Sequence, residues 1–178
     1  MKHIEQIKSG PANVRIDVET NKPMDWVLDD TTFLDYRLGT VARTKEITKS
    51  ATDIFWDRTV DRKTITWMDN YLTLTGNWEQ GELQKILVAL TARRMEENGV
   101  YLFHSSAIRY RDKSILFITG EGNSGKTMSE IEARRRGGAF ISTETTVVDA
   151  KTHLVIAGSK AVFLITRAKG TERSDKPS

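Results

Sequence analysis

The sequence contains no cysteine and no long apolar run. Without cysteine, disulfide bridges, thiolate metal sites and a cysteine nucleophile are excluded. No stretch approaches the roughly 18 to 20 consecutive apolar residues that a membrane-spanning helix needs, and segment 1–10 lacks the apolar core of a secretory signal peptide. We therefore expect a cytoplasmic protein that does not associate with a membrane.

The chain also has little excess of charge of either sign. The 178 residues include 27 Lys and Arg against 24 Asp and Glu, which gives a net charge of +3. Nucleic-acid-binding proteins concentrate basic residues on one face, whereas the densest basic cluster here, 134–136, falls at the expected end of a helix, where the helix dipole favours cations. We therefore expect no nucleic-acid partner. Hydrophobic residues make up 38% of the chain, which is ordinary for a folded domain.

The first part of the chain carries a series of short strand signals. Val14, Ile16 and Val18 alternate with polar residues, the period of two that a half-buried strand produces. We interpret residues 1–77 as a strand-rich N-terminal region. Further strands are expected over residues 53–60, 63–68 and 71–75. The four tryptophans are expected to build a small core rather than a ligand platform; they are Trp26, Trp56, Trp67 and Trp78.

The hydrophobic period changes after residue 77. Leucine and isoleucine residues between positions 83 and 90 follow helical spacing and predict a helix over 78–98, which Asn98 and Gly99 would end. We interpret 78–166 as a second domain and 167–178 as a flexible, charged tail. Within this domain we expect a second helix over 126–136 and strands over 100–110, 115–119, 139–148, 153–157 and 161–166.

A glycine-rich motif lies between an expected strand and an expected helix. Residues 120–127 read GEGNSGKT and satisfy the P-loop pattern G-x-x-x-x-G-K-[ST]. In such a loop the glycines let consecutive backbone N–H groups point at phosphate oxygens, and the helix N-terminus adds partial positive charge. We expect the following residues to bind the phosphates of a purine nucleoside triphosphate: Gly120, Glu121, Gly122, Asn123, Ser124, Gly125, Lys126 and Thr127.

Two residues of this motif have individual roles. Lys126 can reach the β and γ phosphates, and the Thr127 hydroxyl can ligate Mg²⁺. The pattern arises by chance in well under about 1% of chains of this length, and the flanking strand and helix lower that chance further. Nucleotide binding is therefore the firmest prediction from the sequence, and the fate of the phosphate is a separate question.

Segment 103–149 resembles the catalytic domain of the HPr kinase/phosphorylase family and its phosphoenolpyruvate-carboxykinase-like relatives. Proteins of that family share a histidine-bearing strand, a hairpin, an apolar strand that leads into the P-loop, a helix, an Arg-Gly step and a strand that ends in two aspartates. The corresponding pieces here are His104, 118–121, 125–127, Arg136-Gly137 and 141–144. The histidine and the Arg-Gly step make the resemblance more specific than a P-loop alone.

The resemblance implies an α+β fold with a mixed, largely antiparallel core around the P-loop. It also implies ATP and Mg²⁺ as ligands, and transfer of the γ-phosphoryl group to a hydroxyl. At the paired aspartates this sequence has Thr143 and Glu144. Glu144 can serve as a base or a Mg²⁺ ligand, whereas the hydroxyl of Thr143 does not ionise near neutral pH. His104, which lies beside the first aspartate in the family, would lose its charged partner.

Two functions from different classes follow. The first is a kinase that transfers the γ-phosphoryl group of ATP to a hydroxyl of a protein or small metabolite, with Lys126, Glu144 and His104 in catalysis and Thr127 and Glu144 at Mg²⁺. The second is a nucleotide-binding module or subunit without transfer chemistry, which Thr143 and the short stretch after Glu144 favour. That short stretch indicates either a pared-down domain or strands supplied by another chain or a second copy.

Overall fold

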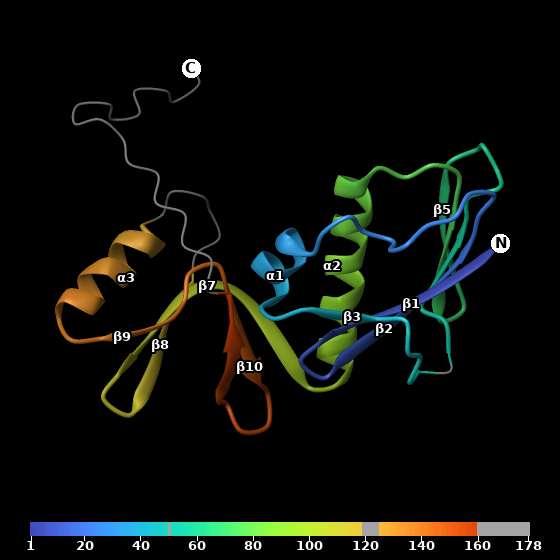
Figure 1. Cartoon of the computed structure of the whole chain (residues 1–178). Coiled ribbons are helices and arrows are strands. Elements are labelled where there is room, and N and C mark those ends of the chain that lie inside the picture. Colours follow the sequence, from blue (N-terminus) through green and yellow to red (C-terminus); the bar gives the residue numbers. More distant parts are fainter. Residues whose placement is uncertain (50, 119–124, 160–178) are drawn as a thin grey trace, which may run out of the picture.

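The computed structural model describes residues 1–49, 51–118 and 125–159. These residues form an α+β fold, as expected from the sequence, and it contains three helices and two sheets. The expected strand 161–166 and tail 167–178 lie outside the described residues. Figure 1 shows two parts side by side, with α1 and α2 beside the first sheet and α3 beside the second. The helices are α1 (Thr32–Leu38), α2 (Gln80–Glu97) and α3 (Lys126–Arg135).

The first sheet has six strands in the order β3-β1-β2-β4-β6-β5. Pairs β2/β4 and β4/β6 are parallel, and the other pairs are antiparallel. Strand β1 was not expected from the sequence, because its central residues Glu5 and Gln6 are polar although both are fully buried. The strands are β1 (Lys2–Ser9), β2 (Ala12–Glu19), β3 (Ala42–Thr44), β4 (Ile54–Asp57), β5 (Thr64–Met68) and β6 (Tyr71–Thr75).

Helices α1 and α2 complete the core of this first sheet. Leu83, Leu87 and Leu90 of α2 are buried in one cluster with strand residues such as Ile16 and Leu74. The change of hydrophobic period after residue 77 predicts that this helix belongs with the P-loop region. The helix contacts both parts, since its buried leucines pack on the N-terminal strands and it also lies against the strand that follows it, Val100–Tyr110. Helix α1 was missed, since seven residues give too few turns for a clear period.

The second sheet has five strands, and all of its pairs are antiparallel. Its order is β11-β10-β7-β8, with β9 also paired to β7. A small buried cluster of Ala12, Met95, Val100 and Val147 joins it to the first part. The strands are β7 (Val100–Tyr110), β8 (Lys113–Ile118), β9 (Ala139–Ser142), β10 (Thr145–Asp149) and β11 (Val155–Gly158).

The strand expected over 139–148 is interrupted at Thr143 and Glu144. Ser142 pairs with Ala107 and Thr145 pairs with His104. Residues 143 and 144 therefore lie beside 106 and 105 in the register of a continuous strand, but they form a bend. Glu144, a residue of the expected site, therefore lies in this bend and not within a strand.

The tryptophans do not share one environment. Trp56 is only 2% exposed and donates its ring N–H to the Gly76 carbonyl at 2.9 Å. Trp67, in contrast, is 40% exposed on the edge strand β5. The expectation that all four build the core is therefore wrong for Trp67, since the consecutive residues 65–68 of β5 are all exposed and no core packs on this part of the strand.

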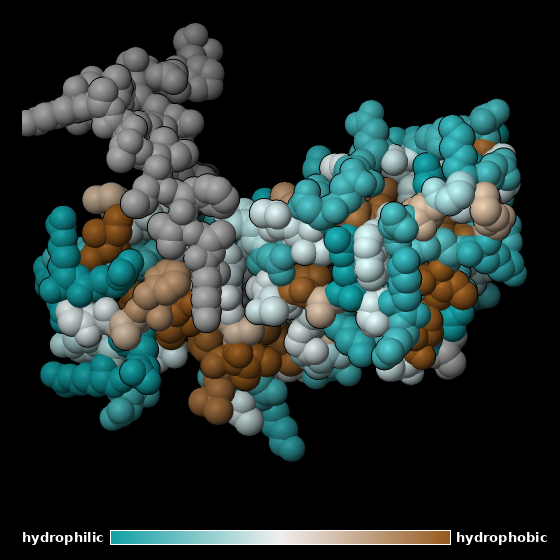
Figure 2. All heavy atoms as spheres, viewed as in Figure 1, coloured by the Kyte–Doolittle hydropathy of each residue, from teal (hydrophilic) through white to brown (hydrophobic). Residues whose placement is uncertain are grey.

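The surface differs between the two parts. In Figure 2, hydrophobic residues gather over the second sheet, in the lower middle of the view. The exposed large hydrophobic residues on this sheet include Tyr101, Ile115, Ile118 and Ile156. Within the described ranges, none of the helices has the length and apolar character that crossing a bilayer requires.

Candidate functional site

The start of α3 provides the first element of the candidate site. Gly125 precedes the helix with φ 90° and ψ 7°, a left-handed conformation that favours glycine. Lys126 is the first residue of the helix, and Thr127 follows it as an exposed residue. The motif residues Gly120, Glu121, Gly122, Asn123 and Ser124 lie outside the described residues.

Lys126 is the cation nearest to this helix start, and it is half-buried. Its Nζ contacts the Nε2 atom of His104. Burial lowers the pKa of the Lys126 ammonium, the negative charge of Glu144 opposes that change, and the positive charge of Arg37 adds to it. Lys126 therefore lies in an electrostatic environment that Glu144 and Arg37 set together.

His104 connects Lys126 to Glu144. Its Nδ1 lies 3.2 Å from Glu144 Oε1, and its Nε2 contacts Lys126. Both contacts are satisfied by a neutral ring whose Nδ1–H donates a hydrogen bond to the carboxylate and whose Nε2 accepts a hydrogen bond from the Lys126 ammonium. The expectation that His104 lacks a charged partner is therefore wrong, because the bend brings Glu144 to its side.

Glu144 is the centre of the site. Its side chain is 18% exposed, and Oε1 accepts a hydrogen bond from Arg37 Nη1 at 3.1 Å in addition to the His104 contact. Its backbone carbonyl accepts the Ser105 N–H at 3.1 Å. The backbone of the bend is thereby fixed to β7, and the carboxylate faces a histidine and an arginine.

Buried hydroxyl groups on the neighbouring strands also hold the bend in place. Ser105 Oγ donates to Thr146 Oγ1 at 2.7 Å, and Ser142 Oγ lies 2.6 Å from the same Thr146 oxygen. Thr143 donates its N–H to the Ser159 carbonyl at 3.1 Å and accepts the Ser106 hydroxyl at 3.0 Å. Thr143 thus has backbone bonds to both neighbouring segments.

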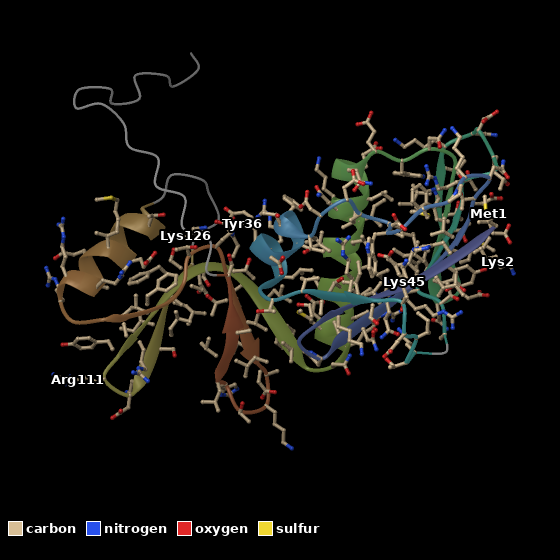
Figure 3. All side chains as sticks on the ribbon, viewed as in Figure 1. Met1, Lys2, Tyr36, Lys45, Arg111 and Lys126 are labelled. Carbon is tan, nitrogen blue, oxygen red and sulfur yellow. The ribbon has the colours of Figure 1, made fainter. Side chains whose placement is uncertain are left out.

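Two residues of the site come from α1, and no motif in the sequence marked them. Arg37 binds Glu144, and its guanidinium lies 5.5 Å from the centre of the Tyr36 ring. Burial raises the pKa of the Tyr36 hydroxyl, and the charge of Glu144 and a hydrogen bond with it raise that pKa further. Figure 3 shows Tyr36 and Lys126 on facing sides of the two parts of the molecule.

Of the expected catalytic residues, Lys126, His104 and Glu144 are brought together, and Arg37 and Tyr36 are added to them. Within the described ranges, no group of three His, Asp or Glu side chains could hold a metal by itself. Mg²⁺ commonly takes one or two protein oxygens and completes its shell with phosphates and water. The Thr127 hydroxyl and the Glu144 carboxylate are oxygen donors of that kind.

Comparisons with known proteins do not identify a family for this chain. None of the models of known protein families matches the chain, and none of the curated proteins matches it.

Proposed function

We propose that the protein binds ATP with Mg²⁺ at the start of α3 and transfers the γ-phosphoryl group to a hydroxyl of a protein or small metabolite. The observation that carries this proposal is the contact chain from Lys126 through His104 to Glu144. It brings a cation and a carboxylate, two groups that kinases use in phosphoryl transfer, to the two sides of an imidazole beside the end of a P-loop sequence.

The charges at this position suit a triphosphate. Lys126 and Arg37 are both cationic, and the N-terminus of α3 adds partial positive charge in the same region. Charge-assisted hydrogen bonds from lysine and arginine are the usual means of holding phosphate oxygens. When bound, Mg²⁺ would neutralise charge on the phosphates. The Thr127 hydroxyl would hold it, and Glu144 would either hold it too or serve as the base, since one carboxylate does not do both at once.

Transfer would use Glu144 as the acceptor of a proton. The bond from the γ phosphorus to the bridging oxygen breaks, ADP leaves, and the acceptor oxygen forms the new bond to phosphorus. The proton of the acceptor hydroxyl passes to the Glu144 carboxylate. His104 would orient that carboxylate through Nδ1, and Lys126 would stabilise the negative charge of the transferred group.

A second function is a nucleotide-binding module without transfer. One specific contact favours it, because Arg37 already compensates the charge of Glu144. The Glu144 Oε1 atom is already engaged by Arg37 and lies beside His104, so it is not free to face an acceptor hydroxyl. In this case Glu144 would hold Arg37 in place for phosphate binding and would take no part in chemistry.

Glu144→Gln separates these two functions, since it keeps the size of the side chain and removes its charge. For the kinase we expect nucleotide affinity without Mg²⁺ to stay close to wild type, and transfer to fall at least roughly a hundredfold. The assay follows γ-labelled ATP with seryl peptides, threonyl peptides and polyols as acceptors. Glu96→Gln, an exposed change on α2, is the matched control.

The result that contradicts the kinase is transfer by Glu144→Gln at the wild-type rate. Binding by the wild type without turnover on any acceptor supports the module instead. Lys126→Ala tests the nucleotide site itself, with exposed Lys113→Ala as its control. If folded Lys126→Ala binds ATP as tightly as Lys113→Ala does, the site at α3 is not a nucleotide site.

A further inference from the structure

The first part of the molecule contains a pocket that takes no part in the proposed nucleotide site. It has a volume of about 450 Å³ and lies between segment 24–29, Trp56, Arg58 and the start of α2. Pockets for small ligands typically measure about 300 to 1,000 Å³. Lys126, His104, Glu144 and Arg37 do not line it. A ligand here would therefore be distinct from the nucleotide.

The wall formed by segment 24–29 is held in place by hydrogen bonds to other elements. Val27 donates its N–H to the fully buried Glu5 carboxylate at 2.8 Å. Gln80 of α2 accepts the Asp29 N–H at 2.9 Å and donates to the Val27 carbonyl at 3.2 Å. The wall is therefore preorganised, which lowers the entropy cost of ligand binding.

The lining combines apolar surface with charges of both signs. Trp26 and Trp78 contribute aromatic surface, and Arg58 lies over the Trp56 ring at 4.8 Å. Arg43 and Lys45 lie over the Trp26 ring, and Lys63 lies over the Trp78 ring, so that a ligand would pack on the part of each ring that these cations leave open. Within the described ranges, Arg58 has no carboxylate partner, and its Nε is buried without a hydrogen bond.

Two exposed acidic residues, Asp25 and Asp29, line the same pocket. Within the part of the chain that the structure describes, the Asp25 and Asp29 side chains make no ion pair and no hydrogen bond. Opposite charges thus line one hollow without pairing with each other. An uncompensated guanidinium attracts a carboxylate, and uncompensated carboxylates attract an ammonium group.

We propose that this pocket binds a free α-amino acid with an apolar side chain. The ligand's carboxylate pairs with Arg58, its ammonium group pairs with Asp25 or Asp29, and its side chain packs on Trp26 and Trp78. A ligand with only a negative charge is repelled by the aspartates, and a ligand with only a positive charge is repelled by Arg58. A zwitterion satisfies both signs at once.

The test uses the purified full chain and three probes with the same phenyl body: L-phenylalanine, 3-phenylpropionate and phenethylamine. Tryptophan fluorescence and calorimetry measure affinity, since three of the four tryptophans line the pocket. We expect L-phenylalanine to bind and each singly charged probe to bind at least about tenfold more weakly, the scale of one lost charged contact. Equal binding of L-phenylalanine and 3-phenylpropionate overturns the proposal, as does no binding of L-phenylalanine.

Variants assign the contacts. Arg58→Gln is expected to weaken L-phenylalanine binding at least about tenfold, and so is the double change Asp25→Asn with Asp29→Asn. Arg62→Gln is the control, because Arg62 is exposed and lies outside the pocket. Circular dichroism checks that each variant is folded. Wild-type affinity in a folded Arg58→Gln variant overturns the assignment of the carboxylate contact and with it the proposal.

Discussion

At the scale of single residues, the environment of Lys126 predicts a dependence on pH. Its ordinary pKa is 10.5, and burial lowers it in the folded protein. The unfolded chain therefore binds more protons at this side chain than the folded chain does. As pH rises from the folded pKa towards 10.5, the contribution of Lys126 to the free energy of unfolding rises with it.

Nucleotide affinity should respond in the opposite direction. A triphosphate binds the charged ammonium, so we expect affinity to fall as pH rises through the lowered pKa of Lys126. Burial and Glu144 raise the pKa of Tyr36 above 10.0, so its hydroxyl stays protonated over this range. Calorimetry from about pH 7 to about pH 10 measures the effect.

Lys126→Arg is the control for this prediction. Arginine stays charged across the whole range, so the fall in affinity should disappear in the variant. An identical fall in both proteins would show that another group causes it.

Two tryptophans give a second prediction at the same scale. Trp56 is 2% exposed, and Trp56→Ala should lower the free energy of unfolding by about 3 to 5 kcal/mol. Trp67 is 40% exposed and lies 4.4 Å from the Arg93 guanidinium, so Trp67→Ala should cost no more than about 1 kcal/mol. Urea unfolding measures both. A larger cost for Trp67→Ala than for Trp56→Ala would contradict this arrangement of the core.

At the scale of elements, the bend between β9 and β10 depends on close packing by β11. Gly158 ends β11, and a Cβ atom built there would lie 2.6 Å from Ser142 Cβ and 3.2 Å from the Thr145 carbonyl oxygen. These two residues flank Thr143 and Glu144. The absent side chain at Gly158 therefore lets the chain approach the bend that carries the site's carboxylate.

Gly158→Ala should accordingly disturb both stability and the site. We expect a loss of about 1 to 3 kcal/mol from overpacking, together with weaker nucleotide binding. Gly81→Ala is the matched control, since a Cβ atom there meets nothing within 4 Å and the position is helical. That change should be neutral or stabilise by up to about 1 kcal/mol. Thermal unfolding and ATP titration measure both, and equal stability of the two variants would contradict the close approach.

At the scale of the whole molecule, α1 connects the two parts. Leu34 and Leu38 are buried in the first core, while Arg37 of the same helix binds Glu144 beside the second sheet. Gly39 follows this helix directly, and a Cβ atom built on it would lie 3.8 Å from the backbone of Gly158 in β11. A short helix thus fixes the N-terminal part against the bend.

Arg37→Ala should loosen this connection. We expect faster amide hydrogen exchange over 139–149, and unchanged exchange in β2 and α2, because the core of the first part remains complete. Arg93→Ala is the control, since Arg93 pairs with Glu97 within α2. Mass spectrometry measures the amide hydrogen exchange of both variants and of the wild type. Protection over 139–149 equal to that of Arg93→Ala would show that the ion pair does not hold the two parts together.

The sequence by itself determined local features. The period of two in 14–18 and the helical spacing in 78–98 predicted β2 and α2, since burial of one face imposes those periods directly on the residues. The P-loop pattern placed Lys126 at the start of a helix for a similar local reason. The P-loop pattern predicts a role for Lys126, and the resemblance of segment 103–149 predicts one for His104 and Glu144. The structure brings these three residues together.

Tertiary structure alone decided the rest. Buried Glu5 and Gln6 hid β1, because their polarity breaks the apolar pattern of a strand. Glu5 Oε2 accepts the Val27 N–H and Gln6 Nε2 donates to Thr48 Oγ1, and both partners are distant in sequence. Arg37 and Glu144 are 107 positions apart, and no local pattern relates them. Their contact depends on α1 packing in one core and the bend packing on another. An ion pair between residues so far apart in sequence depends on the relative position of the two cores. The hydrophobic period and the spacing of motif residues carry no information on that position.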